Sequence, residues 1–388
     1  MLFEDKKRSS LEPARQNQPK FSYLNDSARP IVGLVRDKLE EFFAHYPHPH
    51  KSELMKRIQS RSDVQHESAV FELLLHEILL KMKCQVEVHP ELDGSTTPDF
   101  LVREDDGKQW YLEAKLVTEM STSEHGAESR LDDLLASIDS EGSSKYWLKV
   151  HYRGKPTRTL SGKKIRGTII DWLETLDYSE LLTKFKSNGL TTMPEKIFHF
   201  DGLVLGVSPI PKCSDEETKT FSRQIGITMS SLQASSTAAD LRNAISKKAT
   251  HYDGICKPYY IAINDVNSYV EPSDVLEALY GVQADHFAFS RDGHLSFTVP
   301  TNQNGALIHK NTSVTGCLIG SSVTIWNFAS TTFELYLNPN ARLDSPSALR
   351  RFPTIEIDLE GGDARRHSGL QLAEVLEVSK GWPTRISE

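Results

Sequence analysis

Two carboxylates and one lysine lie close together in the first third of the chain. Pro98-Asp99 precedes an apolar run and a polar turn at Asp106-Gly107, and Glu113-Ala114-Lys115 follows. The segments on either side of the turn are typical of a β-hairpin. Side chains alternate along a strand, so Glu113 and Lys115 share one face, and the paired strand can bring Asp99 to it. Such a group can bind a divalent cation and position a water for attack on a phosphodiester.

The residue types suit magnesium. Mg²⁺ prefers oxygen ligands and keeps most of its waters, so one or two carboxylates are sufficient. The metal lowers the pKa of its bound water and neutralises charge that develops on the phosphate. A neighbouring lysine can orient the water or stabilise the pentavalent phosphorus. We therefore expect metal-assisted phosphodiester hydrolysis with Mg²⁺ as cofactor, for which Mn²⁺ can substitute, rather than acyl transfer or redox chemistry.

Helical and strand-like segments surround these motifs. Residues 69–83 are strongly helical and residues 84–89 alternate like a strand. Downstream we expect a helix near 126–140 and a strand over 146–152. In this order and with these motifs, residues 69–152 resemble the PD-(D/E)xK nuclease superfamily, which includes many restriction endonucleases. The resemblance implies an α/β fold with a restriction-endonuclease-like core, in which helices flank a mixed central sheet.

The resemblance also implies a role for each residue of the two motifs. Asp99 and Glu113 would bind the metal, with the backbone carbonyl of Ala114 as an additional ligand. Lys115 would assist the attacking water.

A glutamate from the first helix often joins sites of this family. Glu72 fits that role best, as a further metal ligand that acts through a bound water. Glu67 and Glu77 remain competitors, because the sequence does not fix where the helix starts.

Composition bounds the class of protein. The chain has 388 residues, of which 38% are hydrophobic and 25% are charged, as in ordinary globular proteins. No apolar run approaches membrane-spanning length, and the N-terminal residues have no apolar signal core. The four cysteines are scattered without metal-ligand spacing, which favours free thiols in a reducing compartment. We expect a cytoplasmic protein with no membrane association.

The net charge of −8 argues against a general DNA-coating protein but allows a local basic groove. Six basic residues are candidates for contacts with nucleic-acid phosphates: Lys149, Arg153, Lys163, Lys164, Lys247 and Lys248. A solvated basic surface is the alternative, and a helix dipole also favours lysines at its C-terminus. The helix that ends in Lys247-Lys248 runs into a buried strand at 258–265, which could extend the edge of the nuclease sheet.

We expect three sections along the chain. Residues 1–28 are polar and are expected to form a flexible arm. Residues 29–280 would form the nuclease-like α/β core, with an insertion around 155–235. Residues 281–388 carry several short strand patterns and turn signals, and are predicted to be a β-rich C-terminal section.

The motifs and the resemblance together predict a DNA endonuclease of restriction or anti-phage defence type, with RNA as an alternative substrate. A single site per chain cuts one strand, so duplex cleavage implies a homodimer. No ATPase motif is present, so any translocation would need a separate ATPase subunit, and a separate specificity subunit also fits. The alternative function is a catalytically silent nuclease-like fold that binds DNA or protein.

Overall fold

The chain folds into two compact units. Unit 1 comprises Met1–Ser9, Lys20–Glu119 and Ser236–Glu388, and unit 2 comprises Ser10–Pro19 and Met120–Ser235. The computed structural model describes residues 1–15, 18–92, 97–117, 125–140, 143, 145–212, 223–230, 237–250, 256–266, 272–281, 287–289, 294–297, 304–308, 311–343, 348–358 and 363–383. Within those ranges no helix is long and apolar enough to cross a membrane.

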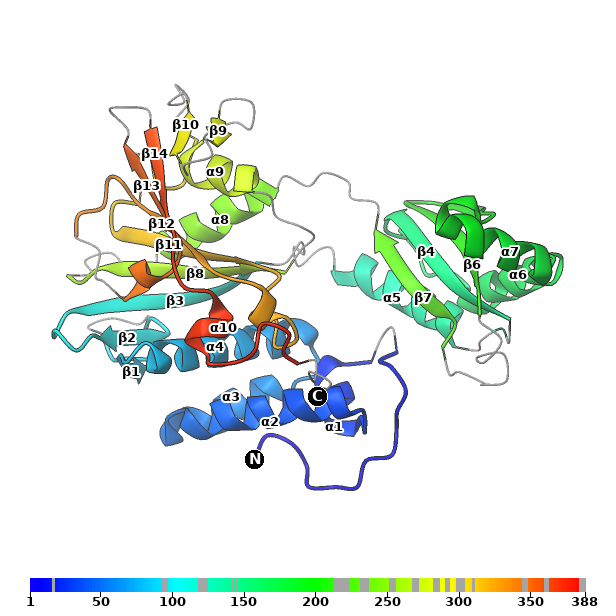
Figure 1. The fold of residues 1–388 in the computed structure, drawn as a ribbon, viewed down its shortest axis with the longest axis horizontal. Helices are drawn as coiled ribbons and strands as arrows, with labels where there is room; N and C mark the ends of the chain where they lie inside the picture. Colours follow the sequence, from blue (N-terminus) through cyan, green and yellow to red (C-terminus); the bar gives the residue numbers. More distant parts are fainter. Residues whose placement is uncertain are drawn as a thin grey trace. The chain divides into compact units, whose positions relative to one another are not determined.

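A mixed sheet of ten described strands forms the centre of unit 1 (Figure 1). In spatial order the strands are β1 (Gln85–Val88), β2 (Phe100–Arg103), β3 (Gln109–Val117), β8 (Tyr259–Asp265), β11 (Val314–Ser321), β12 (Glu334–Leu337), β13 (Thr354–Asp358), β14 (Asp363–His367), β10 (His294–Phe297) and β9 (Phe287–Phe289). Strands β3, β8 and β11 are parallel, as are β12 and β13, and the other neighbours are antiparallel. Every residue of β8 is buried, as expected for a parallel strand covered on both faces.

Helices cover both faces of this sheet. On one face, α4 (Asp63–Lys81) packs with α2 (Pro30–His45) and α3 (His48–Ile58) against Trp110 and Leu112 of β3. On the other face, α8 (Thr237–Ala249) and α9 (Pro272–Tyr280) pack against the alternate residues of β3. Figure 1 shows α4 and α8 on opposite sides of β3. The general α/β class predicted from the sequence is therefore confirmed.

Unit 2 has its own sheet and its own core. Its strands lie in the order β5 (Lys196–Phe200), β6 (Leu203–Pro211), β4 (Tyr146–Gly154) and β7 (Ile225–Ser230). The core contains apolar residues of α5 (His125–Asp139), α6 (Gly162–Glu174) and α7 (Tyr178–Asn188). Short helices complete the described elements of the chain: α1 (Lys20–Asp26), α10 (Leu372–Val375), η1 (Gly189–Thr192), η3 (Phe328–Ser330) and η4 (Leu349–Arg351).

The predicted section boundaries are wrong in two places. The strand expected at 146–152 is β4, which belongs to unit 2, so the insertion begins near residue 120 rather than 155. Residues 281–388 are not a separate section, because β11–β14 continue the sheet that contains β3. Residues 259–265 form β8, which joins the sheet by parallel pairing with β3, but β8 lies inside the sheet between β3 and β11 rather than at its edge.

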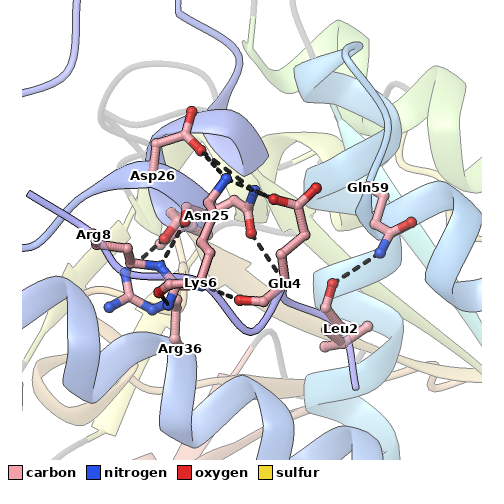
Figure 2. Close-up of polar contacts among 9 residues, drawn as sticks. Leu2, Glu4, Lys6, Arg8, Asn25, Asp26, Arg36 and Gln59 are labelled. Atoms are coloured by element: carbon pink, nitrogen blue, oxygen red, sulfur yellow. Dashed lines mark hydrogen bonds and ion pairs between the residues drawn. The ribbon is translucent and has the colours of Figure 1, made fainter. Parts of the chain in front are cut away.

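The prediction of a flexible arm at residues 1–28 is also wrong. Leu2 and Phe3 are buried in the core of unit 1, and their backbone N–H groups donate to the Glu40 carboxylate at 2.6 and 2.9 Å. The Arg8 guanidinium donates to a backbone carbonyl of α1 at 2.7 Å. Figure 2 shows the contact of Arg8 with Asn25, together with those of Lys6 with Asp26 and of Gln59 with the Leu2 carbonyl. Two apolar residues, Leu2 and Phe3, anchor a segment whose composition is otherwise mainly polar.

Replacing Leu2 by Ala should therefore destabilise unit 1. Truncation of a fully buried leucine removes apolar contacts and leaves a cavity, so we expect the free energy of unfolding to fall by about 2–4 kcal/mol. The measurement is urea unfolding followed by circular dichroism. Leu11→Ala is the matched control, because Leu11 is 67% exposed, and it should change the free energy by less than about 0.5 kcal/mol. Equal effects of the two substitutions would contradict the anchoring.

Candidate active site

The predicted hairpin brings Asp99 against Glu113-Ala114. Strands β2 and β3 are antiparallel, and Phe100 lies opposite Leu112. Asp99 is one residue beyond this pair and therefore lies next to Glu113. Its Oδ2 accepts a hydrogen bond from the Ala114 N–H at 2.7 Å. Gly107 makes the connecting turn with a φ of 84°, a conformation that glycine adopts without strain.

Three carboxylates act on one another at this point. Glu113 and Glu72 are buried and Asp99 is half-buried. Burial raises the pKa of Asp99 well above its usual range, and the charges of Glu113 and then Glu72 raise it further. The N–H of Ala114 opposes this shift only in part. The site therefore carries negative charge that a cation would stabilise.

The structure separates the three helix glutamates that the sequence left open. All three lie on α4, but only Glu72 is among the charges that shift the pKa of Asp99. Glu67 forms an ion pair with Lys20. The Glu77 carboxylate lies 2.8 Å from Nδ1 of His45. Glu72 is thus the helix carboxylate that joins Asp99.

Two residues that the sequence analysis missed hold Glu72 in place. The Tyr46 hydroxyl donates to one carboxylate oxygen at 2.5 Å, and the Arg57 guanidinium donates to the other at 2.7 Å. Tyr46 directly follows α2 and Arg57 lies on α3, both packed beside α4. The sequence contains no local signal for either contact, because both depend on helix packing.

His89 is the third residue that sequence reasoning missed. Its φ of 47° is unusual for a residue with a side chain, and such strain is frequent at functional sites. Its N–H donates to the Asp99 carbonyl at 2.9 Å, and its Nε2 lies 3.8 Å from the nearer Glu72 oxygen. The positive φ is therefore associated with an imidazole directed toward the carboxylates.

Lysines from two elements face the carboxylates. Lys115 is half-buried on the Glu113 face of β3, and its pKa is lowered by burial and then by Lys248 and Lys247. Glu113 partly opposes that shift. Lys248, which the sequence suggested as a phosphate contact, forms an ion pair with Glu113. The end of α8 thus supplies positive charge to the site.

The other predicted phosphate-binding residues are in unit 2. Lys149 and Arg153 lie on β4, and Lys163 and Lys164 are exposed on α6. The structure therefore brings together Asp99, Glu113, Lys115 and Glu72, with Lys247 and Lys248 in the same unit, and assigns the remaining four basic residues to the second unit.

The donor set fits a hard divalent cation. Asp99 and Glu113 carry oxygen donors whose charges repel, and the Ala114 carbonyl is a neutral oxygen on the strand of Glu113. Among the described residues, no group of three or more His, Cys, Asp or Glu side chains is arranged to hold a metal. Ligation by this protein would thus use two carboxylates and one carbonyl, with water in the remaining positions.

Comparison of the chain with protein-family models, with curated proteins and with solved structures found no match. The chemistry of the site is therefore inferred from its own residues.

Asp99→Asn should stabilise the metal-free protein at neutral pH. The pKa of Asp99 is higher in the folded state than its ordinary value of 3.8, so the folded state holds the carboxyl proton more tightly than the unfolded state. The free energy of unfolding therefore falls as the pH rises above 3.8. Asparagine carries no charge but can still accept the Ala114 N–H. We expect its unfolding midpoint in urea with EDTA to exceed that of the wild type at pH 7, with the difference vanishing near pH 4.

Two comparisons sharpen this test. Asp106→Asn, in the exposed turn of the same hairpin, should give no gain, because Lys108 lowers the pKa of Asp106. Ca²⁺ should raise the midpoint of the wild type more than that of Asp99→Asn. A destabilised Asp99→Asn protein at pH 7 would contradict the repulsion among the carboxylates.

Proposed function

We propose that this protein is a magnesium-dependent nuclease of the PD-(D/E)xK type, with DNA as its substrate. The observation that carries the proposal is the grouping of Asp99, Glu113 and Lys115 on one hairpin with Glu72 of the preceding helix. Chance would not be expected to place the motif carboxylates, the lysine and a helix glutamate around one point.

The order of elements supports a restriction-endonuclease-like core. Within unit 1, helix α4 is followed by the three antiparallel strands β1, β2 and β3. Helix α8 comes next in this unit, and then β8, which pairs in parallel with β3. Helix α8 and strand β8 thus have the places that the sequence analysis gave to residues 126–140 and 146–152. The helices on both faces of β3 fit the same interpretation.

The residues divide the chemistry among them. Asp99, Glu113 and the Ala114 carbonyl would hold Mg²⁺, which supplies a water of lowered pKa and offsets phosphate charge. Lys115 orients the attacking water for in-line displacement of the 3′ oxygen, leaving a 5′ phosphate. Glu72 would accept a hydrogen bond from a water in the same site.

The fixed side chains around these groups have positioning roles. Tyr46 and Arg57 hold the Glu72 carboxylate in one orientation, which reduces the entropy lost when the substrate binds. The ion pair between Lys248 and Glu113 balances the site before a cation arrives. Once Glu113 takes part in cation binding, Lys248 becomes available to a phosphate oxygen.

Partners follow from the same proposal. A chain with one such site cuts one strand, so two chains would cut a duplex as a C₂ dimer. A restriction or anti-phage defence role fits a DNA endonuclease, and a separate ATPase or specificity subunit would be compatible with it.

One observation favours the alternative, a nuclease-like fold that binds DNA or protein without cutting. Glu113 and Glu72 each have a cationic partner within the protein, Lys248 and Arg57 respectively. Salt-dependent DNA binding without cleavage in Mg²⁺ or Mn²⁺ would identify that alternative.

The proposal predicts that Asp99→Ala and Lys115→Ala each lower Mg²⁺-dependent DNA cleavage by at least about 100-fold, the usual cost of removing one electrostatic group from an active site. The assay follows plasmid, linear duplex and single-stranded substrates. Glu67→Gln is the matched control, because Glu67 lies on α4 but pairs with Lys20, and it should retain cleavage. Undiminished cleavage by a folded Lys115→Ala protein would exclude this site.

A second prediction concerns pH. Lys247 lowers the pKa of Lys115 through its charge, so Lys247→Gln should raise that pKa. The limb of the pH–rate profile that depends on Lys115 should move to higher pH, measured as kcat/KM under Mg²⁺. Lys108→Gln, which removes a charge from the exposed turn of the same hairpin, should leave the limb in place. A limb that moves to lower pH in Lys247→Gln would contradict the assignment.

A further inference from the structure

The sheet of unit 2 has one face that its helices do not cover. Tyr146, Leu148 and Val150 of β4 belong to the core shared with α5, α6 and α7. Because side chains alternate, the residues between them lie on the opposite face. In the described part of the unit, no helix contributes a core residue to that face. We call it the open face.

One row of residues crosses all four strands of the open face. The strand registers place Ile197 beside Gly206, Gly206 beside His151, and His151 beside Met229. A Cβ on Gly206 would lie 2.0 Å from Cε1 of His151 and 2.6 Å from both ring nitrogens. The imidazole therefore lies over the glycine backbone, in the space a side chain would fill. Its outer side remains partly accessible, since the side chain is 31% exposed.

Apolar side chains are exposed on this face. Ile197 and Met229 are each 50% exposed and Ile227 is 36% exposed. They account for half of the large apolar residues that are exposed in the described chain; the others are Met1, Leu11 and Val64. Their concentration on one sheet face suggests a binding surface rather than scattered surface residues.

Positive charge accompanies the apolar row. Lys149 is paired with Ile227 across β4 and β7, and the exposed Arg153 is paired with Val204 across β4 and β6. The Glu195 carboxylate lies 3.1 Å from Nδ1 of His151. On a chain with a net charge of −8, this local positive charge favours an anionic partner.

We propose that the open face binds an unpaired strand of nucleic acid. Bases would stack on the His151 imidazole and pack against Ile197 and Met229, while Lys149 and Arg153 contact the phosphates. A duplex hides the faces of its bases and would place charged backbone against the exposed apolar side chains, so an unpaired strand fits better. This inference goes beyond the nuclease proposed above, because the face of unit 2 would bind the strand whether or not unit 1 cuts it, and it is tested by binding alone.

The experiment measures the binding of a fluorescent single-stranded oligonucleotide and of the matching duplex by anisotropy, in EDTA and at several salt concentrations. It uses the full chain with Asp99→Ala, so that cleavage plays no part. The parent should bind the single strand at least tenfold more tightly than the duplex. Lys149→Ala/Arg153→Ala should weaken single-strand binding about tenfold and reduce the salt slope by about 1.4, the value for two lost phosphate contacts. Ile197→Ser/Met229→Ser should weaken binding about tenfold with an unchanged slope.

Matched variants complete the design. Lys184→Ala/Lys186→Ala removes two exposed charges from α7, and Val64→Ser removes an exposed apolar residue of α4; both should bind like the parent. Equal or tighter binding of the duplex, or loss of binding in the α7 variant as large as in the β4 variant, would overturn the proposal. So would unchanged DNA binding in Ile197→Ser/Met229→Ser together with a change from dimer to monomer in sedimentation, which would identify a protein interface. If the wild-type protein showed no Mg²⁺-dependent cleavage while single-strand binding was intact, the nuclease proposal would fail and this inference would stand.

Discussion

The parallel pairing of β3 with β8 is the constraint on which the site depends. It aligns Glu113 with Ile261 and Lys115 with Ile263, so the strand that carries the motif is fixed on both sides rather than forming a sheet edge. The crossover into β8 is α8, which consequently packs over β3 and directs Lys248 toward Glu113. β8 also joins the hairpin to β11 and the C-terminal strands.

The electrostatics of the site follow from this arrangement. The hairpin, α4 and the sheet bring three carboxylates into a partly desolvated region, where Glu113 and Glu72 disfavour the ionisation of Asp99. Cations from three elements oppose this charge: Lys115 from β3, Lys248 from α8 and Arg57 from α3. A nearly balanced cluster of this kind can exchange an internal cation for an external one at moderate cost.

The local part of the site could be predicted from sequence, since alternation along a strand and the Asp-Gly turn are short-range signals. The hairpin and the placement of Asp99 near Glu113 depend on nothing else. Tyr46 and Arg57 could not be found this way, because their contacts with Glu72 require the packing of α2 and α3 beside α4. The local pattern locates the strand at 146–152 correctly but cannot say which sheet it joins, and this strand belongs to unit 2 rather than to the sheet of β3. The order of the N-terminal segment could not be predicted, because its two buried residues, Leu2 and Phe3, are surrounded in the sequence by many polar ones.

The separation of β3 from β8 along the chain has a consequence for biosynthesis. Asp265, the partner of Val117, is made about 150 residues later, which at ordinary rates of translation takes roughly 7–30 s. During that interval the hairpin has emerged from the ribosome but β8 has not, so β3 presents unpaired backbone groups. Unit 2 is synthesised within the same interval and has its own core, so it can fold before β3 pairs with β8. The nascent hairpin therefore has an open strand edge, which favours aggregation, and Lys248 reaches Glu113 only after the second unit has been synthesised.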